Sequence, residues 1–196
     1  MKEKERLSLI RQYAIKCSKQ DDIHGFMHVE RVLNLSLQLG KELNANLLIL
    51  EIAALLHDIG RKVKDKMTSS KNHAELSVEK AFKFLKSHDF NLSQENLDNI
   101  FHCIRSHSFS NNSNPLTLEA KILSDADKLD ALGAIGLYRV ISFTVLNKGG
   151  IKEVIEHLEN KILKLKDQLY LDASEEIAKE RQKIILDFYK EIKNEI

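Results

Sequence analysis

The sequence contains little that would interrupt helices. It has a single proline, Pro115, and seven glycines among 196 residues. Proline and glycine are the residues that most strongly end helices and mark turns. Leu, Ile, Lys and Glu are abundant, and no segment alternates strongly between apolar and polar residues. These features predict an all-α fold, and the length fits one domain.

Disulfides, membrane spans and a signal peptide are not expected either. The two cysteines, Cys17 and Cys103, lie far apart and form no CxxC pair, which is typical of reduced thiols. No apolar run approaches the roughly 20 residues that cross a bilayer, and the charged stretch Met1–Arg6 is unlike a signal peptide. We therefore expect a soluble, cytoplasmic protein with no membrane partner.

An excess of one charge is also missing. Lys plus Arg number 30 against 29 for Asp plus Glu, and no basic stripe is interleaved with aromatic residues. A protein that coats nucleic acid would be strongly basic, so no stable nucleic-acid complex is expected. The balance leaves room for a small phosphorylated ligand held by a few local cations.

The spacing of apolar residues predicts a series of amphipathic helices. Asn72 and Ser93 are of the residue types that favour N-caps. The polar, cation-rich connection 61–71 is the longest in the first half of the chain, and long connections often carry function. The predicted helices are 3–18, 26–39, 47–56, 73–87, 93–104, 117–130 and 131–146, with two more in 151–196. Gly40 or Asn44 is expected to end the second of them.

The most informative stretch is Ala53-Ala-Leu-Leu-His-Asp-Ile-Gly60. An apolar helix ends there in two adjacent polar residues, His57 and Asp58. Buried polar groups are costly unless they have partners. A divalent metal would satisfy both side chains at once.

The histidines support this interpretation because they cluster in sequence. A single histidine is most often a satisfied core or surface residue, but His28 repeats with Val32, Leu35 and Leu39 on an apolar helix face. Imidazole and carboxylate ligands suit a divalent metal, and Mn, Ni, Co, Fe, Zn and Mg all remain candidates. Seven of the eight histidines fall between positions 24 and 107: His24, His28, His57, His73, His88, His102 and His107.

The order of these motifs resembles the HD-domain metal-dependent phosphohydrolases, in particular a subgroup of small stand-alone hydrolases. The resemblance covers roughly residues 20–140. It rests on five segments: His24-Gly-Phe-Met-His-Val-Glu-Arg-Val32, Ala53–Gly60 as quoted above, Asn72-His-Ala-Glu-Leu-Ser77, Ile104-Arg-Ser-His107 and Ser124-Asp-Ala-Asp-Lys-Leu-Asp-Ala-Leu-Gly-Ala-Ile-Gly136.

The resemblance implies a single HD domain with its metal-binding core at about 20–140. It also implies that one metal is held by His28, His57, Asp58 and Asp127. Asp125 is the alternative to Asp127, but the family's last ligand usually stands in an Ala-Asp-x-Leu context, as Asp127 does. A helical extension at about 150–196 is expected to cover the core or to form a homodimer interface.

The chemistry of these residues suggests roles in catalysis. Asp58, as a metal ligand, would orient a metal-activated water, and Arg61 and Lys62 in the loop after it are placed to meet substrate phosphates. Lys128 would contact the substrate or pair with Asp130. Many family members carry an acidic residue shortly after His-Asp, whereas this chain has Gly60, Arg61 and Lys62 there. The general base is therefore open, with His24 and Glu30 as substitutes.

Two further histidines leave the number of metals open. His73 and His107 match positions where related binuclear phosphodiesterases place additional ligands. Those enzymes carry a His-His pair where this chain has His107 alone. A second metal, a hydrogen bond behind the first ligands and a phosphate contact are alternatives for His73, His107, His24 and Asp125.

These residues predict a phosphohydrolase that cleaves a phosphoester or phosphoanhydride of a small molecule, for which we expect a nucleotide. One alternative is a phosphodiesterase for cyclic or linear dinucleotides. Another is a regulatory module that binds metal or nucleotide with little turnover, which the missing acidic residue favours.

Overall fold

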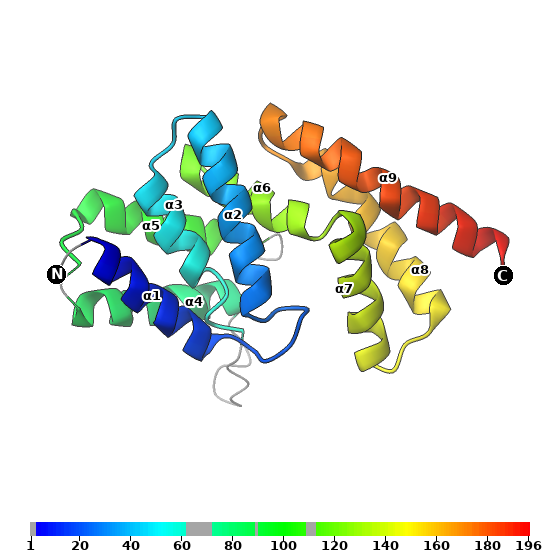
Figure 1. Cartoon of the computed structure of the whole chain (residues 1–196), viewed down its shortest axis with the longest axis horizontal. Coiled ribbons are helices and arrows are strands. Elements are labelled where there is room, and N and C mark those ends of the chain that lie inside the picture. Colours follow the sequence, from blue (N-terminus) through cyan, green and yellow to red (C-terminus); the bar gives the residue numbers. More distant parts are fainter. Residues whose placement is uncertain (1–2, 62–71, 89, 109–112) are drawn as a thin grey trace. The chain divides into compact units, whose positions relative to one another are not determined.

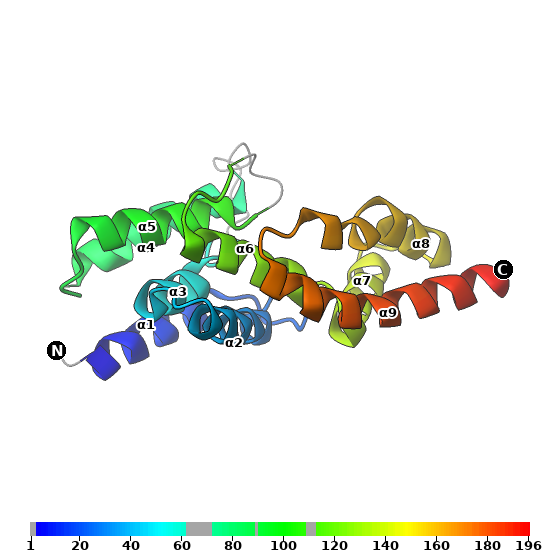
Figure 2. The same cartoon turned by 90° about the horizontal axis from the view of Figure 1, so that it is seen from above.

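The computed structural model describes residues 3–61, 72–88, 90–108 and 113–196. In these ranges every regular element is a helix and no strand is found, which confirms the predicted all-α fold (Figures 1 and 2). The α-helices are α1 (Glu3–Cys17), α2 (Phe26–Glu42), α3 (Leu47–Leu56), α4 (His73–Ser87), α5 (Gln94–Ser106), α6 (Leu118–Asp130), α7 (Gly133–Leu146), α8 (Ile151–Asn160) and α9 (Asp172–Asn194). Two short 3-10 helices, η3 (Ile162–Lys164) and η4 (Lys166–Gln168), lie between α8 and α9.

The chain divides into two compact units, Met1–Ser124 and Asp125–Ile196. The division falls within α6, so this helix contributes residues to both. The single-domain organisation expected from sequence stays a prediction. Within the described ranges, no single helix is long and apolar enough to cross a membrane, and α6 with α7 meets that test only as a bent pair.

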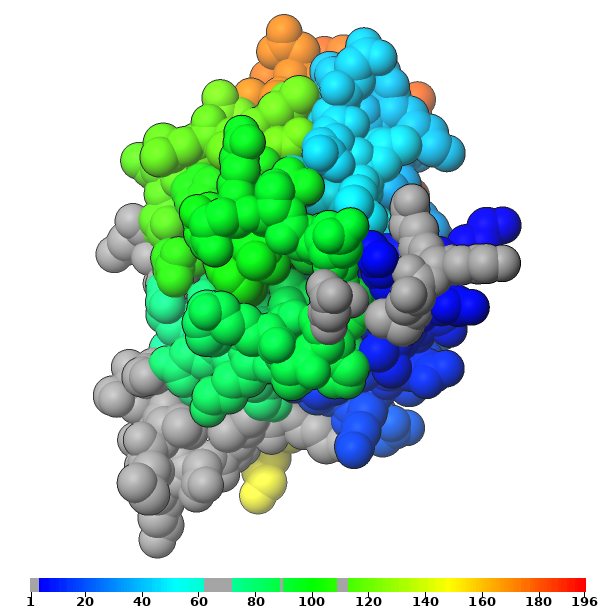
Figure 3. Space-filling model, turned by 90° about the vertical axis from the view of Figure 1, so that its left-hand side faces the viewer, coloured from blue at the N-terminus to red at the C-terminus, as the bar shows by residue number. Residues whose placement is uncertain are grey.

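Helix α3 forms the centre of the first unit. Seven of its ten residues are buried, and it packs against α1, α2 and α5. Its first turn is capped by Asn46, whose side chain accepts hydrogen bonds from the backbone N–H groups of Leu48 and Ile49. Helix α4 pairs with α5, and α1 lies beside them on one face of the molecule (Figure 3), where Tyr13 stacks on Phe84. His57 and Asp58 therefore follow the most buried helix of the unit.

The predicted helix boundaries agree with the structure at most positions. Asn72 and Ser93 cap α4 and α5 through backbone N–H groups in the first turn, as expected. Helix α2 continues to Glu42, past Gly40 and just short of Asn44, the two residues that were predicted as alternative stops. Gly40 therefore lies inside the helix and does not end it. An added Cβ at this position would come within 2.4 Å of Leu50 Cδ1, so the glycine permits close packing of α2 on α3. The chain turns at Asn44, where φ is 55°.

The second unit contains the end of α6 and the helices that follow it. Helix α7 packs against α8 and α9. Between α6 and α7 the chain turns at Gly133, whose φ of 74° is a conformation that favours glycine. Arg181 donates to the Leu129 carbonyl oxygen at 2.7 Å, and Arg139 forms an ion pair with Asp130 at 2.6 Å. These arginines satisfy polar groups at the C-terminus of α6.

Candidate metal centre

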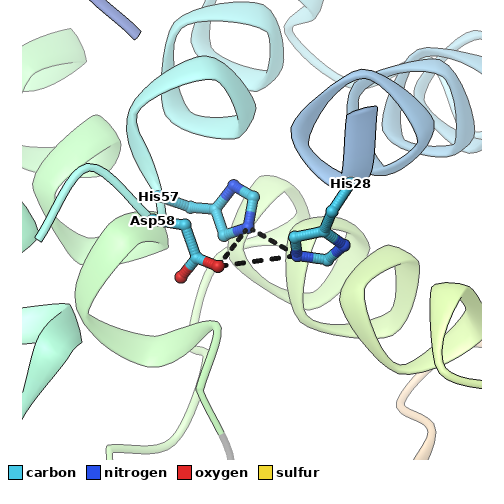
Figure 4. A group of neighbouring side chains, drawn as sticks. All are labelled: His28, His57 and Asp58. Carbon is cyan, nitrogen blue, oxygen red and sulfur yellow. Dashed lines mark hydrogen bonds and ion pairs between the residues drawn. The ribbon is translucent and has the colours of Figure 1, made fainter. Parts of the chain in front are cut away.

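Three buried side chains, from α2 and from the turn that follows α3, meet in the first unit (Figure 4). His28 comes from α2, His57 is the C-cap residue of α3, and Asp58 follows it directly. Both histidine residues are completely buried, and the Asp58 side chain is 2% exposed. The structure thus brings together three of the four metal ligands implied by the sequence resemblance.

The polar atoms of these side chains form a small triangle. His57 Nε2 lies 3.3 Å from His28 Nε2, and Asp58 Oδ2 lies 3.5 Å from His28 Nε2 and 3.6 Å from His57 Nε2. Two ligand atoms that are each about 2.1 Å from one ion lie roughly 3.0 to 3.4 Å apart. The observed separations are close to that spacing.

The backbone fixes which nitrogen of His57 faces this triangle. His57 Nδ1 lies 2.7 Å from the carbonyl oxygen of Ala54, which can only accept a hydrogen bond. Nδ1 therefore carries a proton, so Nε2, which faces His28 and Asp58, is the nitrogen that can present a lone pair to a cation. This arrangement is typical of metal-binding histidines.

A second group of side chains faces the other oxygen of Asp58. His107 Nε2 lies 3.5 Å and His73 Nε2 lies 3.7 Å from Asp58 Oδ1. His107 is the C-cap residue of α5, and its Nδ1 lies 2.7 Å from the carbonyl oxygen of Ile104, as Nδ1 of His57 does from Ala54. His73 begins α4. Asp58 is therefore shared by two groups of potential ligands.

The turn after Asp58 packs closely on α4, which carries His73. The backbone N–H of Gly60 donates to Ser77 Oγ at 2.9 Å, and Lys80 Nζ donates to the Ile59 carbonyl oxygen at 2.8 Å. An added Cβ at Gly60 would lie 2.4 Å from the carbonyl oxygen of His73. Glycine is required here for close approach, and this contact holds the first turn of α4 near Asp58.

Arg61 completes the surroundings of Asp58. Its Nε donates to Asp58 Oδ2, the oxygen that faces His28 and His57. Burial alone would raise the pKa of Asp58, but the nearby Arg61 guanidinium and then His57 hold this pKa well below its ordinary value. Asp58 is therefore an ionised carboxylate able to bind a cation.

The donor set fits a divalent metal. Asp58 Oδ1 and His107 Nε2 are buried and make no hydrogen bond to any residue in the described ranges. Buried polar atoms usually have such a partner. A cation bound to a carboxylate oxygen and imidazole nitrogens would satisfy these atoms, so the residues present can hold the metal that the sequence predicts.

The two candidate carboxylates of α6 differ in their surroundings within the second unit. Asp125 is completely buried and accepts hydrogen bonds from the backbone N–H groups of Tyr170 and Leu171 at 3.0 to 3.1 Å. Lys128 Nζ lies 3.6 Å from Asp125 Oδ1 and 4.5 Å from the centre of the Tyr170 ring. Asp125 thus ties the segment before α9 to α6. Asp127 follows two residues later, which at about 100° per residue places it on nearly the opposite side of the helix.

The remaining predicted residues occupy different surroundings. His24 lies before α2, and its ring centre is 6.5 Å from that of His28 in an edge-on arrangement. Glu30 forms an ion pair with Arg11. His102 Nε2 accepts the backbone N–H of Leu116 at 2.9 Å. Lys62 lies outside the described residues.

Two features of the centre were not anticipated. Ser77 supports the turn after Asp58 through Gly60, and the only indication of this in the sequence was its place in the Asn72–Ser77 motif. Arg61 was expected to face phosphate but is paired with Asp58. Its position three residues after the aspartate, in a turn, was the available signal.

Residues 25–132, more than half of the chain, match the family model described as HD domain. The chain belongs to the HD-domain family. It is 34% identical to the uncharacterized protein YpgQ of Bacillus subtilis (strain 168) over 182 residues, which cover 88% of this chain and 84% of YpgQ. The predicted family is thereby confirmed.

Several solved structures are similar to this chain over nearly its whole length. The crystal structure of Bacillus subtilis YpgQ in complex with ADP has a TM-score of 0.77 at 28% identity, covering 100% of this chain and 97% of that one. The crystal structure of a protein from Lactobacillus plantarum has a TM-score of 0.81 at 27% sequence identity, and the match covers 100% of this chain and 98% of that one. The crystal structure of a predicted HD superfamily hydrolase from an uncultured Thermotogales bacterium has a TM-score of 0.69 at 25% sequence identity, and the match covers 96% of this chain and 91% of that one. This similarity supports a hydrolase.

Proposed function

We propose that the protein is a metal-dependent phosphohydrolase whose substrate is a nucleotide. The observation that carries the proposal is the buried group of His28, His57 and Asp58, with ligand atoms 3.3 to 3.6 Å apart. The nucleotide is supported by the similarity to YpgQ, which has been crystallised with ADP.

His28, His57 and Asp58 would hold the ion, and Asp127 is the proposed fourth ligand. The hydrogen bonds that Asp125 accepts from Tyr170 and Leu171 favour Asp127 over Asp125 in this role. A divalent ion supplies a Lewis acid that polarises a phosphoryl oxygen and lowers the pKa of water. Its identity is open among Mn, Ni, Co, Fe, Zn and Mg.

The protein's own groups would then bind the substrate and guide the proton. We assign phosphate contacts to Arg61, Lys62 and Lys128, because guanidinium and ammonium groups donate strong hydrogen bonds to phosphate oxygens. Asp58 would orient the attacking water. The pairing of Glu30 with Arg11 favours His24 over Glu30 as the group that receives the proton.

The test is hydrolysis of a nucleotide panel by purified protein with a measured metal content. Protein loaded with Mn²⁺ should release phosphate or pyrophosphate, and Asp58→Asn should release neither. Glu75→Gln is a matched control, because Glu75 pairs with Arg105 at 3.1 Å and does not belong to the centre. No release from any nucleotide, with metal verified as bound, would reject the nucleotide substrate.

A phosphodiesterase with two metals is the second candidate. The two oxygens of Asp58 face different histidines, with His28 and His57 near Oδ2 and His73 and His107 near Oδ1. A carboxylate placed in this way could hold two ions. A pair of ions would stabilise the charge on the attacking and leaving oxygens during phosphoryl transfer. Two ions per chain, one of them lost in His107→Ala, with cleavage of a dinucleotide would support this activity. One ion per chain that His107→Ala leaves in place would reject it.

A further inference from the structure

Arg61 and the proposed metal use the same oxygen of Asp58. Oδ2 lies 3.5 Å from His28 Nε2 and 3.6 Å from His57 Nε2, and it accepts the hydrogen bond from Arg61 Nε. The Asp58 side chain is 2% exposed, whereas that of Arg61 is 25% exposed and therefore has access to solvent. The guanidinium thus reaches from the surface to the oxygen at which two imidazoles converge.

This pairing has a clear physical reason. A buried carboxylate is costly unless a cation compensates its charge. The Nδ1–H of His57 is directed at the Ala54 carbonyl oxygen and not at Asp58, so this proton forms no hydrogen bond to the carboxylate. The Arg61 guanidinium supplies the missing positive charge through a hydrogen bond to Asp58.

A divalent ion on the same oxygen changes this balance. The ion would bring two positive charges within a few ångströms of the guanidinium, and arginine cannot lose its proton to relieve the repulsion. Asp58 would also no longer need a second cation. Arg61 and the ion are therefore expected to compete for Asp58 Oδ2.

We propose that Arg61 is a place-holding cation, which neutralises Asp58 before metal binding, leaves Asp58 when a divalent ion binds, and then contacts a substrate phosphate. The inference rests on the proposed function, and it assigns to Arg61 a displacement that couples metal loading to substrate binding. A substrate with at least one phosphate group near the ion is the ligand that the released guanidinium would recognise.

The backbone around Arg61 restricts the movement to its side chain. The Arg61 backbone N–H donates to the Asp58 carbonyl oxygen at 3.0 Å. The preceding residues are held on α4 by the contacts of Gly60 with Ser77 and of Lys80 with Ile59. Rotation about the side-chain bonds of Arg61 is therefore sufficient to free Asp58 Oδ2.

The metal affinity of Arg61 variants shows whether Arg61 competes with the ion for Asp58 or supports Asp58 as a metal ligand. Titration calorimetry with Mn²⁺ should show that Arg61→Gln, which removes the charge, binds the ion at least about tenfold more tightly than the wild type. Removing a partner that supports a ligand has the opposite effect and weakens metal binding about 10- to 100-fold. Arg61→Lys keeps the charge and should remain close to the wild type. Arg105→Gln is the matched control, because it removes a guanidinium from an exposed ion pair with Glu75.

A second measurement on the wild type does not depend on a variant that folds poorly. In nuclear magnetic resonance spectra, the Nε–H signal of Arg61, identified by its absence from Arg61→Lys, should shift and exchange faster with water when Zn²⁺ is added. Unchanged or weaker Mn²⁺ affinity in Arg61→Gln, or an Nε–H signal that persists in the metal-bound protein, would overturn the inference.

The two proposals fail in different ways. Tighter metal binding by Arg61→Gln without hydrolysis of any nucleotide would leave the place-holding role intact and reject the nucleotide hydrolase. Hydrolysis by the wild type, together with weaker metal binding by Arg61→Gln, would support the nucleotide hydrolase and reject the place-holding role. If neither form binds a divalent ion, both proposals are rejected.

Discussion

Asp58 and Asp125 are both buried carboxylates, but their surroundings differ in kind. Asp125 accepts backbone N–H groups from Tyr170 and Leu171 and pairs with Lys128, so its oxygens are engaged within the second unit. Asp58 faces histidine nitrogens at 3.5 to 3.7 Å, and its Oδ1 makes no hydrogen bond to the described residues. A carboxylate surrounded by N–H donors stabilises a fold, whereas one surrounded by imidazole lone pairs is suited to bind a cation.

Replacing Asp58 should have the largest effect. Asp58→Asn keeps the shape of the side chain but removes the charge that a metal requires. We expect the metal affinity to fall more than about 100-fold, beyond the range seen for residues that only support a ligand, and hydrolysis to fall to background. Calorimetry with Mn²⁺ and a phosphate-release assay would measure both. Wild-type metal affinity in Asp58→Asn would place the metal elsewhere.

Asp125→Ala should have the converse effect, on stability. It leaves the N–H groups of Tyr170 and Leu171 and the ammonium of Lys128 without their acceptor. Removing one partner of a buried ion pair destabilises a protein by about 3–5 kcal/mol. Urea unfolding would give this value. A loss below about 1 kcal/mol would show that Asp125 does not anchor the segment before α9.

Gly60→Ala tests the support of Asp58 by α4. The added methyl group would lie 2.4 Å from the His73 carbonyl oxygen and 2.6 Å from the Ser77 nitrogen, so the turn must shift. We expect a destabilisation of about 1–3 kcal/mol, as for overpacked cores, with weaker metal binding. Gly150→Ala is the control, because the nearest atom to its added Cβ is Glu153 Oε2 at 3.7 Å. Equal stability of the two variants would contradict the packing argument.

The smallest expected effect is on the pH dependence of unfolding, which should differ between Asp58 and Asp125. The pKa of Asp58 is lowered in the folded protein, where Arg61 and His57 outweigh burial, so its contribution to stability is present above pH about 4 and lost in more acidic solution. Burial raises the pKa of Asp125 despite the opposing effect of Lys128, so its contribution is full below pH about 4 and is lost as the pH rises.

Unfolding in urea with a chelator present would measure this difference. The loss of stability in Asp58→Asn should grow as the pH rises to about 4 and then stay level to pH 7, whereas the loss in Asp125→Asn should shrink as the pH rises above about 4. Gly150→Ala keeps both aspartates, so its unfolding at each pH corrects for general effects of pH on the protein. Slopes of the same sign for both aspartate variants would contradict the assigned surroundings.

Sequence patterns were sufficient to predict the helices and the residues that meet at Asp58. The apolar run before His57 and the position of His28 on an apolar helix face both identify side chains directed into the core. The packing role of Gly40 and the partners of Arg61 could not be predicted. Gly40 is a packing residue only because Leu50 approaches it, and Arg61 pairs with Asp58 only because α4 holds the intervening turn.

The choice between Asp125 and Asp127 shows the same limit of local patterns. Both residues stand near the end of α6 and are separated by Ala126 alone. The residues that distinguish them, Tyr170 and Leu171, are more than 40 positions away in sequence. Their N–H groups reach Asp125 through the folding of the second unit, which no local spacing reveals.

The most direct test of the central claim is anomalous diffraction from crystals of the protein soaked in Mn²⁺. We predict one strong peak about 2.1 Å from Asp58 Oδ2 and from the Nε2 atoms of His28 and His57, with Asp127 as a further ligand and with Arg61 turned away. A second peak near Asp58 Oδ1, His73 and His107 would indicate two metals. Manganese bound only at other sites, with Arg61 still on Asp58, would contradict the proposed metal centre.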